Sequence, residues 1–131
     1  MTDTIYRENI LDHFRNPRNF GPLTGADASH TEANELCGDR IEMQVKYATD
    51  KGKQTIDEIK FQGEGCAIAV ASASLLTDHV KGKSVTEVRT MDAGNITKLL
   101  GIPLTPSRLK CALLSLEALH KTLDLVKNSS K

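Results

Sequence analysis

The sequence has no excess of charge of either sign and no long apolar run. Seventeen Lys and Arg residues balance seventeen Asp and Glu residues, so the formal net charge is zero. A neutral chain has no broad basic field, which argues against a protein that holds nucleic acid through one. The longest weakly polar stretch, residues 66–76, is far too short to span a bilayer. Neither a nucleic-acid partner nor a membrane partner is therefore expected.

Tryptophan is absent, and no secretory leader is visible. Residues 1–8 lack a basic start followed by an apolar run, so we expect a cytoplasmic protein. The length of 131 residues suits a single domain over residues 1–131, which needs no disulfides to fold. Three cysteines are an odd number, and a reducing compartment disfavours disulfides. They are therefore buried core residues, reactive thiols or metal ligands.

The apolar pattern predicts one helix, a small sheet and then further helices. Residues 3–15 have helical spacing, and residues 23–36 leave room for one short strand. Alternation over residues 40–48, and again around Ile59 and Phe61 beyond a turn, indicates a hairpin. Residues 67–80 form a helix of small residues, and Ser84-x-x-Glu87 is a capping-box signature for the next helix.

The last helix is predicted to start at Thr105-Pro106, a cap residue followed by a proline. One apolar stripe along it should be buried, made of Leu109, Leu113, Leu116, Leu119, Leu123 and Val126. We therefore predict an α+β domain with a small antiparallel sheet of about three strands. Helices should pack on one face of the sheet, in the order α-β-β-β-α-α-α.

Each cysteine lies at a junction between predicted elements. Cys37 precedes the first clear strand, Cys66 stands where a strand passes into a helix, and Cys111 lies in the second turn of the last helix. With the carboxylate of Asp39 they offer four ligands, a set that suits tetrahedral zinc and equally an iron–sulfur cluster. The spacing alone leaves three separate buried cysteines as an alternative. The histidines are expected to be packing or solvated groups, His13 on its helix included.

Several separated motifs occur in a recognisable order: Tyr6 and Asp12–Gly21, Cys37-Gly-Asp39, Phe61-x-Gly-x-Gly-Cys-Ala-Ile-Ala69 with Ala71–Ser74, and Lys110-Cys111-Ala-Leu-Leu. In these motifs the chain resembles, nearly end to end, the U-type iron–sulfur cluster assembly scaffolds: IscU, the N-terminal domain of NifU, and SufU. The resemblance implies that Cys37, Cys66 and Cys111 bind a cluster or zinc. It also implies that Asp39 tunes how readily the cluster leaves.

The resemblance further implies a function and partners. A scaffold of this kind accepts sulfur from a cysteine desulfurase as a persulfide, here at Cys111 or Cys37. It combines the sulfur with iron, assembles a transient [2Fe–2S] cluster on the three cysteines and transfers the cluster to acceptor proteins. Such a chain is a platform rather than an enzyme with turnover of its own.

Two positions depart from the IscU pattern. Lys110 stands where IscU proteins carry a histidine, and Leu104–Arg108 replaces the segment read by a dedicated chaperone, so a role for that chaperone is doubtful. Lys110 is similar to the SufU pattern, and its charge would stabilise a Cys111 thiolate. The segment between Cys66 and Cys111 is nevertheless too short for the insertion that SufU carries. A zinc-dependent sulfurtransferase and a structural zinc domain therefore stay as alternatives.

Overall fold

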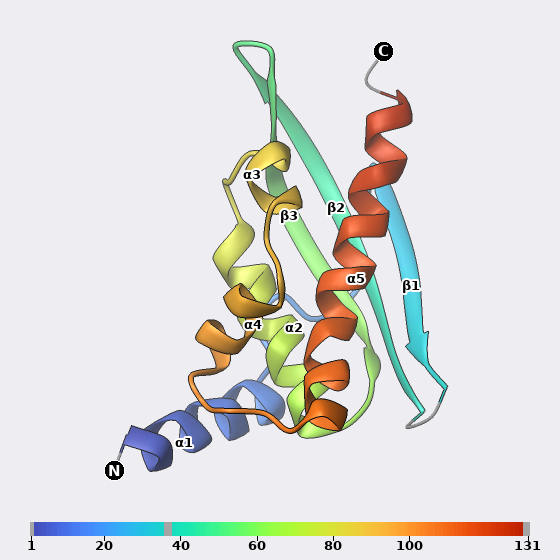
Figure 1. Cartoon of the computed structure of the whole chain (residues 1–131). Coiled ribbons are helices and arrows are strands. Elements are labelled where there is room, and N and C mark those ends of the chain that lie inside the picture. The colour runs from blue at the N-terminus through green and yellow to red at the C-terminus, as the bar shows by residue number, and fades with distance from the viewer. Residues whose placement is uncertain (1, 36–37, 130–131) are drawn as a thin grey trace.

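The computed structural model describes residues 2–35 and 38–129, with side chains described for residues 7–35, 38–49 and 51–125. Its antiparallel sheet has the order β1-β2-β3, made of β1 (Ala28–Asn34), β2 (Asp39–Asp50) and β3 (Lys53–Glu64). Helices α2 (Ala67–Val80) and α5 (Pro106–Ser129) lie side by side on one face of the sheet, and α1 (Thr2–Arg15) packs against α2 (Figure 1). The predicted α+β class, with a three-stranded antiparallel sheet, is confirmed.

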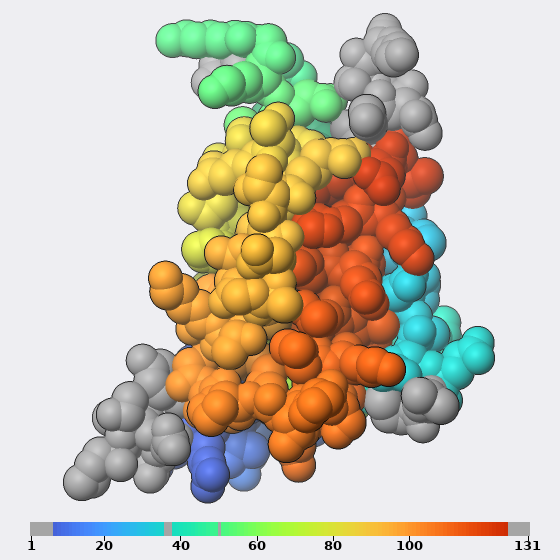
Figure 2. All heavy atoms as spheres, viewed as in Figure 1, coloured from blue at the N-terminus to red at the C-terminus, as the bar shows by residue number. Residues whose placement is uncertain are grey.

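Within the described residues, four helices follow the sheet, one more than the predicted order. Two short ones, α3 (Val85–Arg89) and α4 (Ala93–Leu100), occupy the segment before α5. They are separate because α3 ends at Thr90 and Asp92 then begins a new helix with its own capping box, shared with Asn95. Figure 2 shows α3, α4 and α5 forming one continuous surface over the sheet. No helix in the described ranges is both long enough and apolar enough to cross a membrane.

The β2–β3 hairpin owes its register to alternating residues and one irregularity. Met43 pairs with Phe61 and Val45 with Ile59, and all four side chains are buried on the inner face. The register shifts between Lys46 and Tyr47. This bulge returns Ile56, three residues before Ile59, to the inner face, which a strict alternation would not do.

Strand β1 is polar on both faces, so the sequence did not define its bounds. Along β1 half-buried residues alternate with exposed ones, and the half-buried set includes His30 and Glu32. Glu32 Oε2 accepts a hydrogen bond from Lys121 Nζ at 2.9 Å, which ties this strand to α5. The ion pair lowers the pKa of the Glu32 carboxyl, chiefly through the hydrogen bond from Lys121. Its contribution to stability is modest because both side chains are partly exposed.

The edge of β3 is covered by two connecting segments. The N–H of Phe61 donates to the carbonyl of Asn19 at 2.9 Å, and the N–H of Ile56 donates to the carbonyl of Lys83 at 2.9 Å. The same two residues also accept from Gly21 and Gly82. The backbone N–H and carbonyl groups of Ile56 and Phe61 at this edge are thereby satisfied within the chain.

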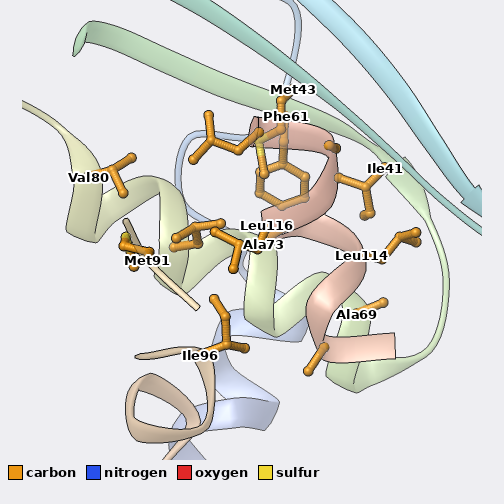
Figure 3. Packing of buried hydrophobic residues seen from close by; sticks show 14 of the residues in the cluster. Ile41, Met43, Phe61, Ala69, Ala73, Val80, Met91, Ile96, Leu114 and Leu116 are labelled. Atoms are coloured by element: carbon orange, nitrogen blue, oxygen red, sulfur yellow. The ribbon is translucent and has the colours of Figure 1, made fainter. Parts of the chain in front are cut away.

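The core fills the space between the sheet and the helices. Figure 3 shows Met43 and Phe61 of the sheet pointing toward Ala73 of α2 and Leu116 of α5. Small buried residues on α2, among them Ala69, Ala71 and Ala73, lie in the layer that contacts α5. One correction concerns the α5 stripe. Leu116, Leu119 and Leu123 are buried as predicted, but Leu114 is buried where Leu109 and Leu113 are only half-buried, and the side chain of Val126 lies outside the described residues.

Helix α1 is anchored to α2 by buried polar contacts. His13 is 7% exposed, and its Nδ1 lies 2.7 Å from Ser74 Oγ. The same hydroxyl accepts the N–H of Arg18 at 2.8 Å. Burial lowers the pKa of His13, which keeps the ring neutral in the folded protein. His13 is therefore a helix-packing residue, as the sequence predicts.

Candidate metal and cluster site

Three element ends meet at one end of the molecule. Asp39 is the first residue of β2, Cys66 is the N-cap of α2, and Cys111 lies in the second turn of α5. Figure 1 shows the starts of β2, α2 and α5 and the end of β3 at the same end of the molecule. Antiparallel pairing produces this arrangement, because β3 returns to the level at which β2 began. The junctions at Asp39, Cys66 and Cys111 are thus neighbours in space.

The donor atoms of Asp39, Cys66 and Cys111 all lie within 4.8 Å of one another. Two thiolates on one tetrahedral zinc ion, with bonds of about 2.3 Å, are about 3.8 Å apart. Shifts of about 1 Å therefore bring the three donors onto one ion. Cys37, the fourth predicted ligand, lies outside the described residues, two positions before Asp39 in the chain.

Asp39 is buried at 2% exposure and is held by the start of α2. Its Oδ1 accepts the backbone N–H of Cys66 at 3.0 Å, and its Oδ2 lies 3.7 Å from the Sγ of the same residue. The first turn of α2 has no acidic residue. The partial positive charge at this helix end interacts favourably with the Asp39 carboxylate that accepts the Cys66 N–H.

Two glycines shape the approach of β3 to this point. Gly63 has φ +142°, and a Cβ there would lie 2.0 Å from the carbonyl oxygen of Arg40, so both its conformation and its close contact require glycine. Gly65 does not have a positive φ, yet a Cβ there would lie 2.7 Å from Asp39 Oδ1. The two glycines thus serve different purposes.

Cys111 is 8% exposed and is fixed by the packing of α5 on α2. The hydroxyl of Ser72, on α2, donates to the carbonyl of Ala112 at 2.8 Å. Ser115 Oγ lies 3.3 Å from the Ser72 hydroxyl, and the three residues are all buried. A hydrogen bond between the helices therefore fixes the position of α5 against α2 next to Cys111. Sequence reasoning did not single out Ser72, because nothing local marks one serine in a helix rich in small residues.

Cys66 is exposed, unlike Asp39 and Cys111. Of the three described donors, Cys66 is therefore the one most open to solvent. Lys110 is exposed as well, and among the described side chains it has no ion-pair partner. Its predicted role as a stabiliser of the Cys111 thiolate stays a prediction.

The donor chemistry fits soft or borderline metals. Two thiol sulfurs and one carboxylate oxygen converge. No histidine of the described residues joins them, since His30 contacts Glu32, His120 contacts the Val88 carbonyl and His79 is exposed on the last turn of α2. Thiolates select zinc and iron–sulfur clusters, whereas magnesium and calcium prefer oxygen alone. The residues therefore fit zinc or a cluster.

A shallow hollow of about 320 Å³ lies on the other face of the sheet, lined by Thr31, Arg40, Glu42, Gln62, Gly63 and Glu64. The hollow is open and polar, and it contains neither cysteine of the described site.

Comparisons with known proteins agree with this geometry. Residues 5–130 match the family model of the NifU-like N-terminal domain. The chain is 38% identical to the zinc-dependent sulfurtransferase SufU of Bacillus subtilis, over 91% of this chain and 89% of that protein. It is 34% identical to an iron–sulfur cluster assembly scaffold protein, IscU 1 of Archaeoglobus fulgidus, over 91% of this chain and 74% of the relative.

Among solved structures, the chain is similar to the putative SUF-system scaffold protein of Fervidobacterium islandicum. The TM-score is 0.72 at 26% identity, over 92% of this chain and 97% of the other. A second solved structure, described as a hypothetical protein, gives a TM-score of 0.76 at 30% identity. The fold and the sequence both match this family. The chain belongs to the NifU-like N-terminal domain family, which includes the IscU and SufU relatives.

Proposed function

We propose that this chain is an iron–sulfur cluster assembly scaffold. The observation that carries the proposal is the convergence of Asp39, Cys66 and Cys111, whose donor atoms lie within 4.8 Å of one another in a family with scaffold members. Cys37 would complete a set of three thiolates and one carboxylate. The cargo is a [2Fe–2S] cluster, held until an acceptor protein takes it.

A ligand set of thiolates and one carboxylate suits a protein that passes its cluster on better than one that retains it. A carboxylate is a harder ligand than a thiolate and holds iron less firmly. Asp39 would therefore be the ligand that exchanges first when an acceptor protein offers its own cysteines. The exposure of Cys66 leaves one side of the cargo open to that acceptor.

Sulfur would come from a cysteine desulfurase. A thiolate of this chain attacks the outer sulfur of the desulfurase persulfide, a new S–S bond forms, and the desulfurase thiolate leaves. Conversion of that sulfur to sulfide then takes two electrons from an external reductant such as a dithiol. Cys111 and Cys37 are the proposed acceptors. Because Cys111 is only 8% exposed, attack there requires its neighbours to move apart, whereas Cys37 lies outside the described residues.

The decisive measurement is the metal and acid-labile sulfide content of anaerobically purified protein. A scaffold yields iron and sulfide in equal amounts after incubation with ferrous iron, cysteine and a cysteine desulfurase. Cys66→Ser should lose this cluster, whereas His79→Gln, which removes an exposed potential ligand elsewhere on α2, should keep it. Protein that takes up only stoichiometric zinc, and no iron with sulfide, would contradict the proposal.

A SufU-like zinc-dependent sulfurtransferase is the second candidate, favoured by the 38% identical relative and by Lys110. In that case Cys37, Asp39, Cys66 and Cys111 would hold zinc, which supplies a Lewis acid that keeps thiols deprotonated. Lys110→Ala should then slow alkylation of Cys111 in the metal-free protein and lower sulfur uptake in the zinc-loaded protein. If zinc is bound but no persulfide is accepted, the protein is a structural zinc domain instead.

A further inference from the structure

We propose that Gly65 is a positioning residue for the Asp39 ligand. Its missing side chain leaves the space in which the Asp39 carboxylate reaches the N–H of Cys66, the N-cap of α2. This inference builds on the proposed function, because it concerns how one ligand of the proposed site is held.

The space beside Gly65 is filled by the carboxylate itself. A Cβ at Gly65 would lie 2.7 Å from Asp39 Oδ1, 2.9 Å from Cγ and 3.1 Å from Cβ. Real Cβ atoms essentially never approach heavy atoms within 3.0 Å. A side chain at position 65 therefore has to displace the carboxylate or the strand end that carries it.

Backbone conformation does not explain this glycine. Gly65 is not among the residues with positive φ, so a left-handed backbone conformation does not require glycine here. Gly63, two residues earlier, contrasts with it, since φ there is +142° and the close neighbour is backbone. The requirement at position 65 is for room next to Asp39.

The displaced carboxylate would lose its orientation. Asp39 Oδ1 accepts the N–H of Cys66 at 3.0 Å, so that oxygen is already bound to the protein. Oδ2 lies 3.7 Å from Cys66 Sγ and is the oxygen left to face a metal ion. Asp39 is 2% exposed and has little space for another rotamer. Gly65 thus fixes which oxygen is offered and where.

We predict that the effect of Gly65→Ala on metal affinity depends on the presence of the Asp39 carboxylate. Supporting contacts around metal ligands are typically worth 10- to 100-fold in metal affinity. Gly65→Ala should therefore weaken Zn²⁺ binding by about 10- to 100-fold. Asp39→Gly, which removes the carboxylate itself, should weaken binding by a similar factor. The double variant should bind as Asp39→Gly does, to within about twofold, because the contact that Gly65 protects is gone.

The experiment is a double-variant cycle on the full chain. Wild type, Gly65→Ala, Asp39→Gly and the double variant are prepared reduced and metal-free under nitrogen. Zn²⁺ affinity is measured by competition with a chelator, and Co²⁺ binding by thiolate-to-cobalt absorption. Thermal unfolding of the metal-free proteins supplies a second cycle, which should show that Gly65→Ala lowers the midpoint only while Asp39 is present.

Gly94→Ala is the matched control. Gly94 also has no positive φ and also lies beside an aspartate at a helix start, because a Cβ there would lie 3.3 Å from Asp92 Oδ1. Asp92 caps α4 and is not part of the ligand cluster. Gly94→Ala should leave Zn²⁺ affinity and the cobalt spectrum unchanged.

The inference would be overturned if Gly65→Ala binds Zn²⁺ as tightly as wild type. It would also be overturned if Gly65→Ala lowers Zn²⁺ affinity by the same factor in the wild-type and the Asp39→Gly proteins. If Gly65→Ala alone does not fold, a folded double variant supports the inference and an unfolded one contradicts it. A wild type that binds neither ion would count against the proposed function alone, since the unfolding cycle needs no metal.

Discussion

The hydrogen bond from Ser72 to α5 permits a quantitative prediction about Cys111. Replacing Ser72 by alanine removes a buried hydroxyl that donates to the Ala112 carbonyl at 2.8 Å. A buried hydrogen bond of this kind contributes about 1 kcal/mol to stability. For a domain of this size that loss lowers the melting temperature by about 4 °C. Losing the bond changes metal affinity only through a shift of α5, so the effect on affinity cannot exceed the free energy of the bond itself. A free energy of about 1 kcal/mol corresponds to an upper bound of about fivefold weaker metal binding.

Thr122→Val is the control for this prediction. Thr122 is buried on the same helix, and its hydroxyl donates to the carbonyl of Ala118 at 2.7 Å, within α5 rather than between helices. Both variants should lose comparable stability in thermal unfolding of the metal-free protein. Only Ser72→Ala should also weaken Zn²⁺ binding in chelator competition, by about two- to fivefold. Equal Zn²⁺ affinities for both variants would refute the reasoning that this bond positions Cys111.

Three further predictions concern Asp39, bound metal and His13. Asp39→Ala should give a longer-lived cluster, because the most exchangeable ligand is removed. The visible absorption of the cluster is followed under air, and a faster decay in the variant than in wild type would contradict this role of Asp39. Adding zinc should raise the melting temperature of the metal-free protein, and a chelator should reverse this rise. The metal-free protein should still unfold cooperatively, and a metal-free form with no unfolding transition would contradict the view that the hydrophobic core folds without metal. Burial lowers the pKa of His13, so the unfolded chain binds the extra proton first, and stability should fall as pH drops below about 6.5. His13→Asn places an amide that does not titrate near Ser74, so its melting temperature should fall less between pH 7.5 and pH 5.5. Identical falls for the two proteins would exclude His13 as the cause.

Local signals were sufficient where they coincided with packing. The helix predicted over residues 67–80 is α2, because Cys66 stands at its N-cap and Lys81 and Gly82 follow its last residue. The hairpin was found because inward apolar residues alternate with outward polar ones. Strand β1 could be placed only as one short strand within residues 23–36. Its inward side chains include Glu32, whose partner Lys121 is distant in the sequence.

The sequence indicated which residues make up the candidate site, but not the contacts that hold those residues in place. Asp39, Cys66 and Cys111 stand at element ends, and an antiparallel sheet with helices on one face brings such ends together. The bond from Ser72 and the close approach of Gly65 to Asp39 depend on contacts between elements that no local pattern encodes. The burial of Leu114 in place of Leu113 has the same origin, since the rotation of α5 is set by α2 and the sheet.

The turn between β2 and β3 is a natural attachment point for a reporter. Lys51 and Gly52 both have positive φ there, and Figure 1 shows the turn at the opposite end of the hairpin from the start of α2. At about 3.3 Å per residue, β3 alone separates the two ends by roughly 40 Å. A fluorophore coupled to this turn would sit well away from the ligands. It would let cargo transfer to an acceptor be followed by energy transfer without altering the thiols that hold the cargo.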